Sequence, residues 1–125
     1  MAGIFYDRNA FLNLSFELIH IGINIGIPDE AHSLAAQLSD MFHLNPKHGD
    51  KSEFAGAYIA CRKAPSYGTN GHIAMGTANV DTAVVALTEK GCAFNKDTGA
   101  YNDDGTQKNI YLNGGFGGFL YDCLK

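Results

Sequence analysis

Two segments of the chain, 52 residues apart, resemble each other. The first begins at His20 with His-Ile-Gly-Ile and reaches Asp29 nine positions later; the second begins at His72 with His-Ile-Ala-Met and reaches Asp81 at the same spacing. An alanine lies two residues after each aspartate. A repeat at a fixed offset is typical of a domain built from copies of one small unit. The sequence therefore predicts two related units, whose histidines occupy equivalent positions and can meet across a pseudo-twofold axis.

The overall composition limits the class of protein. A chain of 125 residues with 46% hydrophobic residues suffices for one domain with its own core. A net charge of -4 argues against nucleic acid or an anionic membrane as partner, because phosphate binding needs clustered lysines and arginines. No apolar run approaches the roughly 20 residues of a membrane span. The three cysteines, Cys61, Cys92 and Cys123, include no C-x-x-C pair. We therefore expect a cytoplasmic protein without a disulfide framework.

The first unit shows a strand and a helix. Isoleucines occupy alternate positions of residues 17–25, which predicts a β-strand with a covered isoleucine face and an open face that carries His20. Pro28, an acidic first turn and a 3.6-residue apolar rhythm then predict a helix over about 28–43. Short strand-like pieces follow, the last at about 56–62.

The second unit repeats this order. We expect a strand over 71–78, in which Ile73 and Met75 face away from His72, and a helix from about Asp81 that ends at Gly91. After it come a short strand near 92–94 and two strands at roughly 107–113 and 117–123, separated by a Gly114–Gly115 turn.

Together these elements predict an α+β fold, in which two tandem βαβββ units form one curved mixed sheet with the helices outside. Residues 1–15 do not match the second half and are expected to form an N-terminal arm. The domain then spans 16–125, with unit one at 16–63, a Pro- and Gly-rich linker at 64–70 and unit two at 71–125.

The run GHIAMGT…VDTAVVALTEKGCAFN and the ending KNIYLNGGFGGFLYDCLK carry a family resemblance. Over about residues 17–125 the chain resembles the vicinal oxygen chelate superfamily, which includes glyoxalase I, bleomycin-resistance proteins and extradiol dioxygenases. Within it, the two runs look most like the C-terminal domain associated with bacterial 2-keto-3-deoxy-6-phosphogluconate / 4-hydroxy-2-oxoglutarate aldolases. The Schiff-base barrel of such aldolases needs roughly 200 residues, so this chain cannot contain it.

The resemblance implies a metal site on the first and last strands of each unit. By motif, its ligands correspond to His20, His72 and Asp122, and the bound ion would be a divalent metal such as Ni, Mn, Zn or Fe. The fourth position, a glutamate in the family pattern, falls on Ala60. Loss of that carboxylate weakens metal binding and removes the usual general base. The alternative is a metal-free site, in which the imidazoles and the carboxylate bind each other or a polar ligand.

Residues at alternate positions of the last strand of unit one face the same side as the histidines and complete the expected ligand site. Tyr58 and Ala60 would line the main cavity on the concave face, and Arg62 would lie near its mouth to bind a carboxylate or phosphate, or else in solvent. The full ligand-binding set is His20, Tyr58, Ala60, Arg62, His72 and Asp122. The remaining histidines, His32, His43 and His48, are expected on the surface.

Three functions remain open on the sequence alone. The first is a small-molecule binding domain for an oxygen-rich 2-oxo acid or phosphorylated sugar acid, linked to an aldolase of the type named above. The second is a metal-dependent lyase, isomerase or dioxygenase of the vicinal oxygen chelate type, with no catalytic residue assigned. The third is a scaffold whose site has decayed. Expected partners are a small molecule, a second copy of the chain in a homodimer, and an aldolase.

Overall fold

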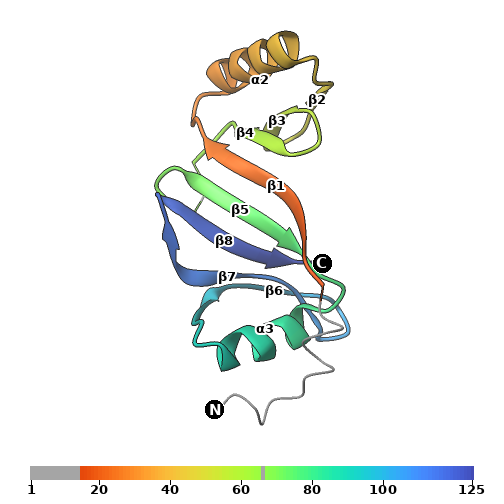
Figure 1. The fold of residues 1–125 in the computed structure, drawn as a ribbon, viewed down its shortest axis with the longest axis vertical. Coiled ribbons are helices and arrows are strands. Elements are labelled where there is room, and N and C mark those ends of the chain that lie inside the picture. Colours follow the sequence, from red (N-terminus) through yellow and green to blue (C-terminus); the bar gives the residue numbers. More distant parts are fainter. Residues whose placement is uncertain (1–14, 66) are drawn as a thin grey trace.

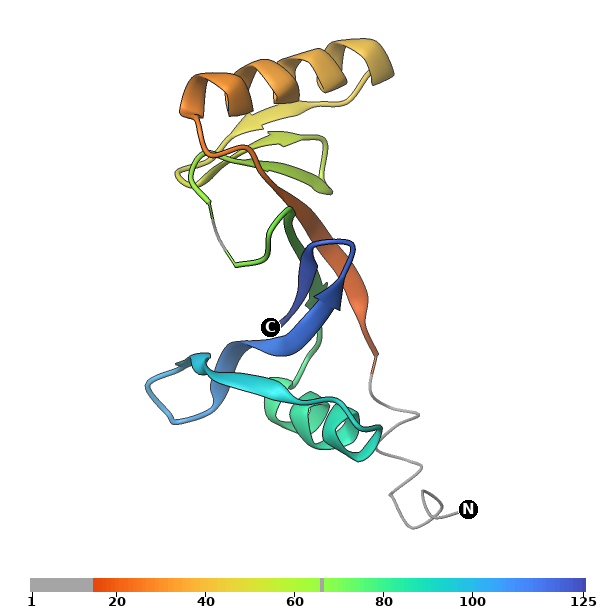
Figure 2. The ribbon, with the colours of Figure 1, turned by 90° about the vertical axis from the view of Figure 1, so that its left-hand side faces the viewer.

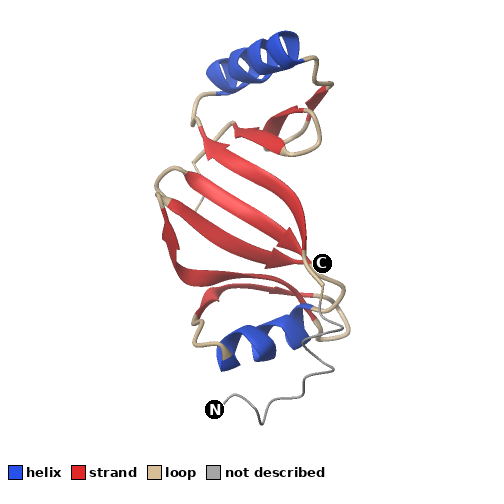
Figure 3. Ribbon diagram, viewed as in Figure 1, coloured by secondary structure: helices blue, strands red, loops and turns tan. Residues whose placement is uncertain are grey.

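The structure, a computed structural model, describes residues 15–65 and 67–125, so the predicted arm at 1–15 lies almost wholly outside the described residues. Within the described part, the elements of unit one are β1 (Glu17–Asn24), α2 (Pro28–Phe42), β2 (Pro46–His48), β3 (Ser52–Ala55) and β4 (Ile59–Arg62). The elements of unit two are β5 (Gly71–Gly76), α3 (Val80–Glu89), β6 (Phe94–Tyr101), β7 (Gln107–Phe116) and β8 (Phe119–Leu124). Both units therefore have the predicted order βαβββ (Figures 1 and 3).

The strands form one mixed sheet in the order β2-β3-β4-β1-β5-β8-β7-β6. In each unit the first strand pairs in parallel with the last, β1 with β4 and β5 with β8. The two units join where β1 pairs antiparallel with β5, at the centre of the sheet. A side view shows that the sheet is curved (Figure 2). The predicted α+β architecture is confirmed.

The two helices begin and end as local chemistry dictates. α2 starts at Pro28, which suits a first helical position, and is acidic in its first turn. It ends at His43, whose φ of 55° is the left-handed conformation that commonly stops a helix. α3 starts one residue before the expected Asp81, because the Asn79 side chain caps it by accepting a hydrogen bond from the Thr82 backbone N–H.

The register settles which side chains share a face. Gly22 lies opposite both His72 and Ala60, whereas Ile23 lies opposite Cys61. Cys61 packs against α2 residues and Cys123 against α3 residues, in two separate apolar clusters. The histidines of β1 and β5 therefore lie on the face away from the helices, as predicted.

The opposite face of β1 and β5 is less covered than expected. Ile21, Ile23, Ile73 and Met75 are only half-buried and lie outside both apolar clusters. α2 packs on β2, β3 and β4, and α3 packs on β7 and β8, so the helices lie toward opposite ends of the sheet (Figures 1 and 2). The prediction that this face packs under the helices is wrong in this respect, because each helix returns over the later strands of its own unit.

Two local details also differ from the predictions. A β-bulge between Leu18 and His20 interrupts the isoleucine alternation and places Leu18 opposite Met75. Gly114–Gly115 is not a turn but lies inside β7, and the turn is formed by Gly117 and Gly118, both with positive φ. β6 is also longer than the short strand expected near 92–94, because pairing with β7 continues through a polar stretch without alternation.

No helix within the described part of the chain is long and apolar enough to cross a membrane. The three cysteines are free, and two of them, Cys61 and Cys123, are buried.

Candidate binding site on the concave face

The two histidines of the repeat meet at the centre of the sheet. His20 Nε2 and His72 Nε2 are 3.0 Å apart, and the rings contact edge to face with centroids separated by 5.1 Å. Because one ring nitrogen must donate and the other accept, this contact requires that at least one imidazole is neutral. The prediction that equivalent histidines meet across the two units is confirmed.

A glycine makes this contact possible. The His72 ring lies across Gly22, and a Cβ at position 22 would fall within 2.6 Å of the ring Nδ1. Glycine in a strand often marks such a close approach. Position 22 is therefore restricted to glycine as long as the His72 ring keeps its place.

The imidazole pair is held neutral. Burial, together with the positive charges of His20 and Arg62, lowers the pKa of His72 to about 4. The pKa of His20 is lowered as well, first by burial and then by Arg62. Neutral imidazoles can act at neutral pH as hydrogen-bond partners or as metal ligands.

Three buried polar atoms on this face have no hydrogen-bond partner within the protein: His72 Nδ1, Arg62 Nε and Asp122 Oδ1. Arg62 uses another nitrogen, Nη1, to donate to Ser52 Oγ at 3.3 Å. Burial raises the pKa of Asp122 to about 6, against the lowering effect of a hydrogen bond with the Asn109 side chain. An unsatisfied buried polar group costs about 1–3 kcal/mol. Several buried polar atoms without hydrogen-bond partners on one face are typical of a site that binds a ligand.

Aromatic rings enclose the histidine pair. Phe54 contacts the His20 ring edge to face at 6.3 Å, and Tyr111 contacts the His72 ring at 6.0 Å. Tyr67, from the segment between β4 and β5, packs on Tyr111 with ring centroids 4.8 Å apart. His72 is only 3% exposed, whereas His20 and Arg62 are half-buried. The face is therefore accessible mainly beside His20 and Arg62.

Tyr58 is placed differently from the prediction, whereas Ala60 lies on the predicted face but is buried. Tyr58 lies in the turn before β4 with an exposed side chain, and it contributes a backbone carbonyl that accepts a hydrogen bond from the Ile21 N–H. Ala60 faces the concave side but is only 1% exposed, between Gly22 on β1 and Phe54 on β3.

Three cavities of the structure lie away from the histidine pair. In the described part of the chain, the cavity of about 490 Å³ lies where β1 begins and β5 ends, lined by Phe16, Ile19 and Lys125 among others. A cavity of about 230 Å³ lies beside α3, and one of about 140 Å³ lies under α2. None of these three is lined by His20 or His72, so the main cavity expected around the histidine pair stays a prediction.

The predicted metal ligands fit only in part. Two nitrogens that bind one ion at about 2.1 Å each would lie roughly 3.0–3.4 Å apart, which the histidine pair matches. The Asp122 carboxylate does not join them: among the described residues, the one set of three such side chains whose ligand atoms all lie within 4.8 Å of one another is His32, His48 and Glu53. Two imidazoles without the carboxylate do not make a complete metal site.

No protein-family model and no curated protein matches this chain. Solved structures do. A hypothetical protein, BH1468 from Bacillus halodurans C-125, is 18% identical, with a TM-score of 0.59 over 88% of this chain and 94% of that one. Streptomyces coelicolor methylmalonyl-CoA epimerase (Q60A), in complex with 2-nitronate-propionyl-CoA, is 18% identical, with a TM-score of 0.52 over 88% and 97%. The Mycobacterium tuberculosis methylmalonyl-CoA epimerase is 13% identical, with a TM-score of 0.52 over 86% and 85%.

The fold is glyoxalase-like. The likeness to these structures concerns the fold, and at that level the predicted glyoxalase-like arrangement of two βαβββ units is confirmed. At these identities the likeness extends no further than the fold, and none of the three proteins is an aldolase-associated domain by its description. The ligand of this glyoxalase-like domain must be inferred from its own residues.

Sequence reasoning missed one cluster. His32 and His48 are exposed, as expected, yet both contact the buried carboxylate of Glu53. One local signal was available: the run His48-Gly-Asp-Lys-Ser-Glu53 has a glycine at the start of a short loop, and the hairpin that it forms pairs His48 with Glu53. The packing of α2 over this hairpin, which adds His32, has no local signal.

Proposed function

We propose that the concave face binds a small, elongated, oxygen-rich acid, of the class of phosphorylated sugar acids. One observation carries the proposal: the unpartnered atoms of Arg62, His72 and Asp122 lie on one face of the sheet. A guanidinium is suited to a carboxylate or phosphate, and a carboxylate with a raised pKa is suited to a hydroxyl or keto oxygen. The neutral imidazoles between them can donate to, or accept from, further oxygens.

The strand order favours a long ligand over a short one. Arg62 lies on β4 and Asp122 on β8, with β1 and β5 between them. Three strand spacings amount to about 14 Å, part of which the arginine side chain can span. A three-carbon acid such as pyruvate is too short to contact both residues. An acid with a phosphate at one end and hydroxyl groups along its chain is long enough.

The proposal also includes the partners implied by the sequence. A ligand of this class would connect the domain with an aldolase that makes or consumes such acids. The half-buried isoleucine face of β1 and β5, which the helices leave uncovered, supports a homodimer as the state in solution.

Replacing Arg62 by methionine should weaken binding of 6-phosphogluconate about tenfold, because a charge-assisted hydrogen bond is lost while the aliphatic stem remains. In isothermal titration calorimetry, pyruvate should also bind the wild-type protein more weakly than 6-phosphogluconate does. The matched control is Lys96→Met, which removes one positive charge from the exposed edge strand β6 and should leave affinity unchanged. Equal affinities in wild type and Arg62→Met, or no binding of 6-phosphogluconate at millimolar concentration, would refute the proposal.

A metal-dependent enzyme is the second candidate, and the 3.0 Å spacing of the two Nε2 atoms favours it. What this site lacks is a nearby anionic ligand. Ala60 lies beside Gly22, over which the His72 ring extends, so a carboxylate from position 60 would come close to the histidine pair.

Ala60→Glu should therefore raise the affinity for Ni²⁺, Mn²⁺ or Zn²⁺ at the histidine pair about tenfold, by adding the missing ligand. Calorimetric titration against wild type measures this, and His72→Ala in the Ala60→Glu background should abolish the gain. Because position 60 is nearly fully buried, Ala60→Gln serves as the control for overpacking without charge. An equal affinity in Ala60→Glu and Ala60→Gln would exclude a metal centre at these residues.

A further inference from the structure

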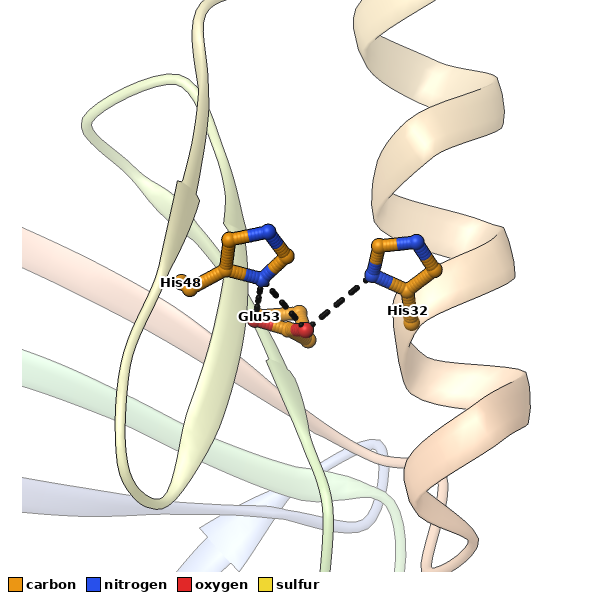
Figure 4. Close-up of side chains that lie close together, drawn as sticks. All are labelled: His32, His48 and Glu53. Carbon is orange, nitrogen blue, oxygen red and sulfur yellow. Dashed lines mark hydrogen bonds and ion pairs between the residues drawn. The ribbon is translucent and has the colours of Figure 1, made fainter.

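A second cluster of ligand-type side chains lies on the other face of the sheet, in unit one. His32 of α2, His48 of β2 and Glu53 of β3 come together between the helix and the hairpin (Figure 4). We propose that these three residues form a binding site for a divalent transition-metal ion, such as Zn²⁺, independent of the concave face.

The geometry centres on the glutamate. Glu53 has a side chain that is only 7% exposed, and its Oε1 lies 2.8 Å from His48 Nδ1 and 3.1 Å from His32 Nδ1. The second oxygen, Oε2, lies 2.9 Å from His48 Nδ1. The two imidazole rings are nearly parallel, at an interplanar angle of 7° and a centroid distance of 5.3 Å. Both Nδ1 atoms therefore point at the same carboxylate (Figure 4).

Two imidazoles and one carboxylate are a common protein ligand set for Zn²⁺, with water in the fourth position. Ligand atoms of a tetrahedral ion lie roughly 3.3 Å apart. The two N···O distances to Glu53 are a few tenths of an ångström shorter, and the ligand atoms of all three residues lie within 4.8 Å of one another, so side-chain movements on the order of 1 Å would admit an ion. A cavity of about 140 Å³ borders all three side chains and offers room for the fourth ligand.

The exposure of the histidines favours metal binding chemically. Without metal, each Nδ1–H donates to Glu53, which lowers the pKa of this carboxyl and keeps it ionised. To bind a metal, each imidazole must move its proton from Nδ1 to Nε2. The side chains of His32 and His48 are 58% and 76% exposed, so water can accept a hydrogen bond from the Nε2–H. The change of tautomer needs no net loss of a proton from a neutral imidazole.

The site is separate from the concave face. Glu53 pairs with Cys61, which faces α2, whereas Ala60 faces the histidine pair of β1 and β5. Two positive side chains lie near: Lys47 borders the cavity, and Lys63 acts on the carboxyl of Glu53. They reduce the affinity for a cation, so we expect micromolar rather than nanomolar binding.

The test uses the His72→Ala protein, in which the concave pair is removed. Titration with Zn²⁺ by calorimetry should show one site per chain, and Co²⁺ should give the visible absorption of a tetrahedral centre. Glu53→Gln and His48→Ala should each weaken Zn²⁺ binding about tenfold or abolish it. His48 is exposed, so its variant will fold even if Glu53→Gln does not. The control is His43→Asn, which removes another exposed histidine at a left-handed position that asparagine tolerates.

Zn²⁺ affinity in the His72→Ala protein that is unchanged by His48→Ala, or lowered equally by His43→Asn, would show only nonspecific binding to surface histidines and overturn the proposal. Absence of Zn²⁺ binding at 100 µM metal would overturn it as well.

Discussion

Replacing Gly22 by alanine is expected to destabilise the domain by about 1–3 kcal/mol, the usual cost of overpacking a filled site. The new Cβ would overlap the His72 ring, which must then leave its position over β1 and give up the contact with His20. We also expect loss of ligand binding at the concave face. Urea denaturation measures the stability, and NMR of the imidazole resonances reports whether the pair persists.

The control for this variant is a double-mutant cycle with His72→Ala. Once the ring is absent, alanine at position 22 should be neutral or slightly stabilising, because glycine in a strand costs more conformational entropy than alanine. If Gly22→Ala is equally costly with and without the His72 ring, the cost comes from elsewhere and the glycine does not serve the histidine pair.

The concave face should also show two opposite dependences of stability on pH. His72 has its pKa lowered to about 4, so its contribution to stability is complete above the unfolded value of 6.5 and is lost as pH falls toward 4. Asp122 has its pKa raised to about 6, so its contribution is complete below 3.8 and is lost as pH rises through 6. Each amounts to on the order of 2–3 kcal/mol, and in the wild-type protein they largely offset each other between pH 4 and 6.5.

Single variants should separate the two dependences. Between pH 7 and 4.5, the free energy of unfolding of Asp122→Asn should fall by about 2 kcal/mol relative to wild type, and that of His72→Gln should rise by a similar amount. Urea denaturation at pH 7, 5.5 and 4.5 gives these values. The other titrating groups are common to all three proteins, so their effects cancel in the comparison. Parallel pH curves for the three proteins would show that neither group is perturbed in this way.

The repeat allowed much of the fold to be predicted from sequence. An offset that aligns a strand, a turn and a helix start determines the order of elements in both units, and alternation in β1 determines the face of His20. The bulge beside Leu18 and the extent of β7 past Gly114 could not be predicted. Both depend on pairing with a neighbouring strand, and the residues of one strand alone do not determine that pairing.

In the candidate sites, too, some contacts could be predicted from the sequence and others could not. The equivalent positions of His20 and His72 in the repeat predicted their contact, because the symmetry of the repeat relates two residues that are far apart in the sequence. The role of Gly22 depends on the direction in which one ring leans, and the His32 contact with Glu53 depends on how α2 packs on a hairpin. Neither is a property of spacing along the chain. The family pattern also placed Asp122 with the histidines, whereas its carboxylate is not among the close ligand sets.

The junction between β1 and β5 has an evolutionary consequence. When two identical half-length chains associate about a twofold axis, any residue near the axis meets its own copy, so one histidine codon would have produced the whole pair. After duplication and fusion, each copy was free to diverge. The cluster under α2 has no counterpart among the described residues of the other half. The position 52 residues after His32 holds Val84, and Ile110 pairs with Cys123 on β8 as Glu53 pairs with Cys61 on β4. The central pair is thus what fusion of such a homodimer would leave, whereas the cluster under α2 would have to be gained by one half, or lost by the other, after fusion.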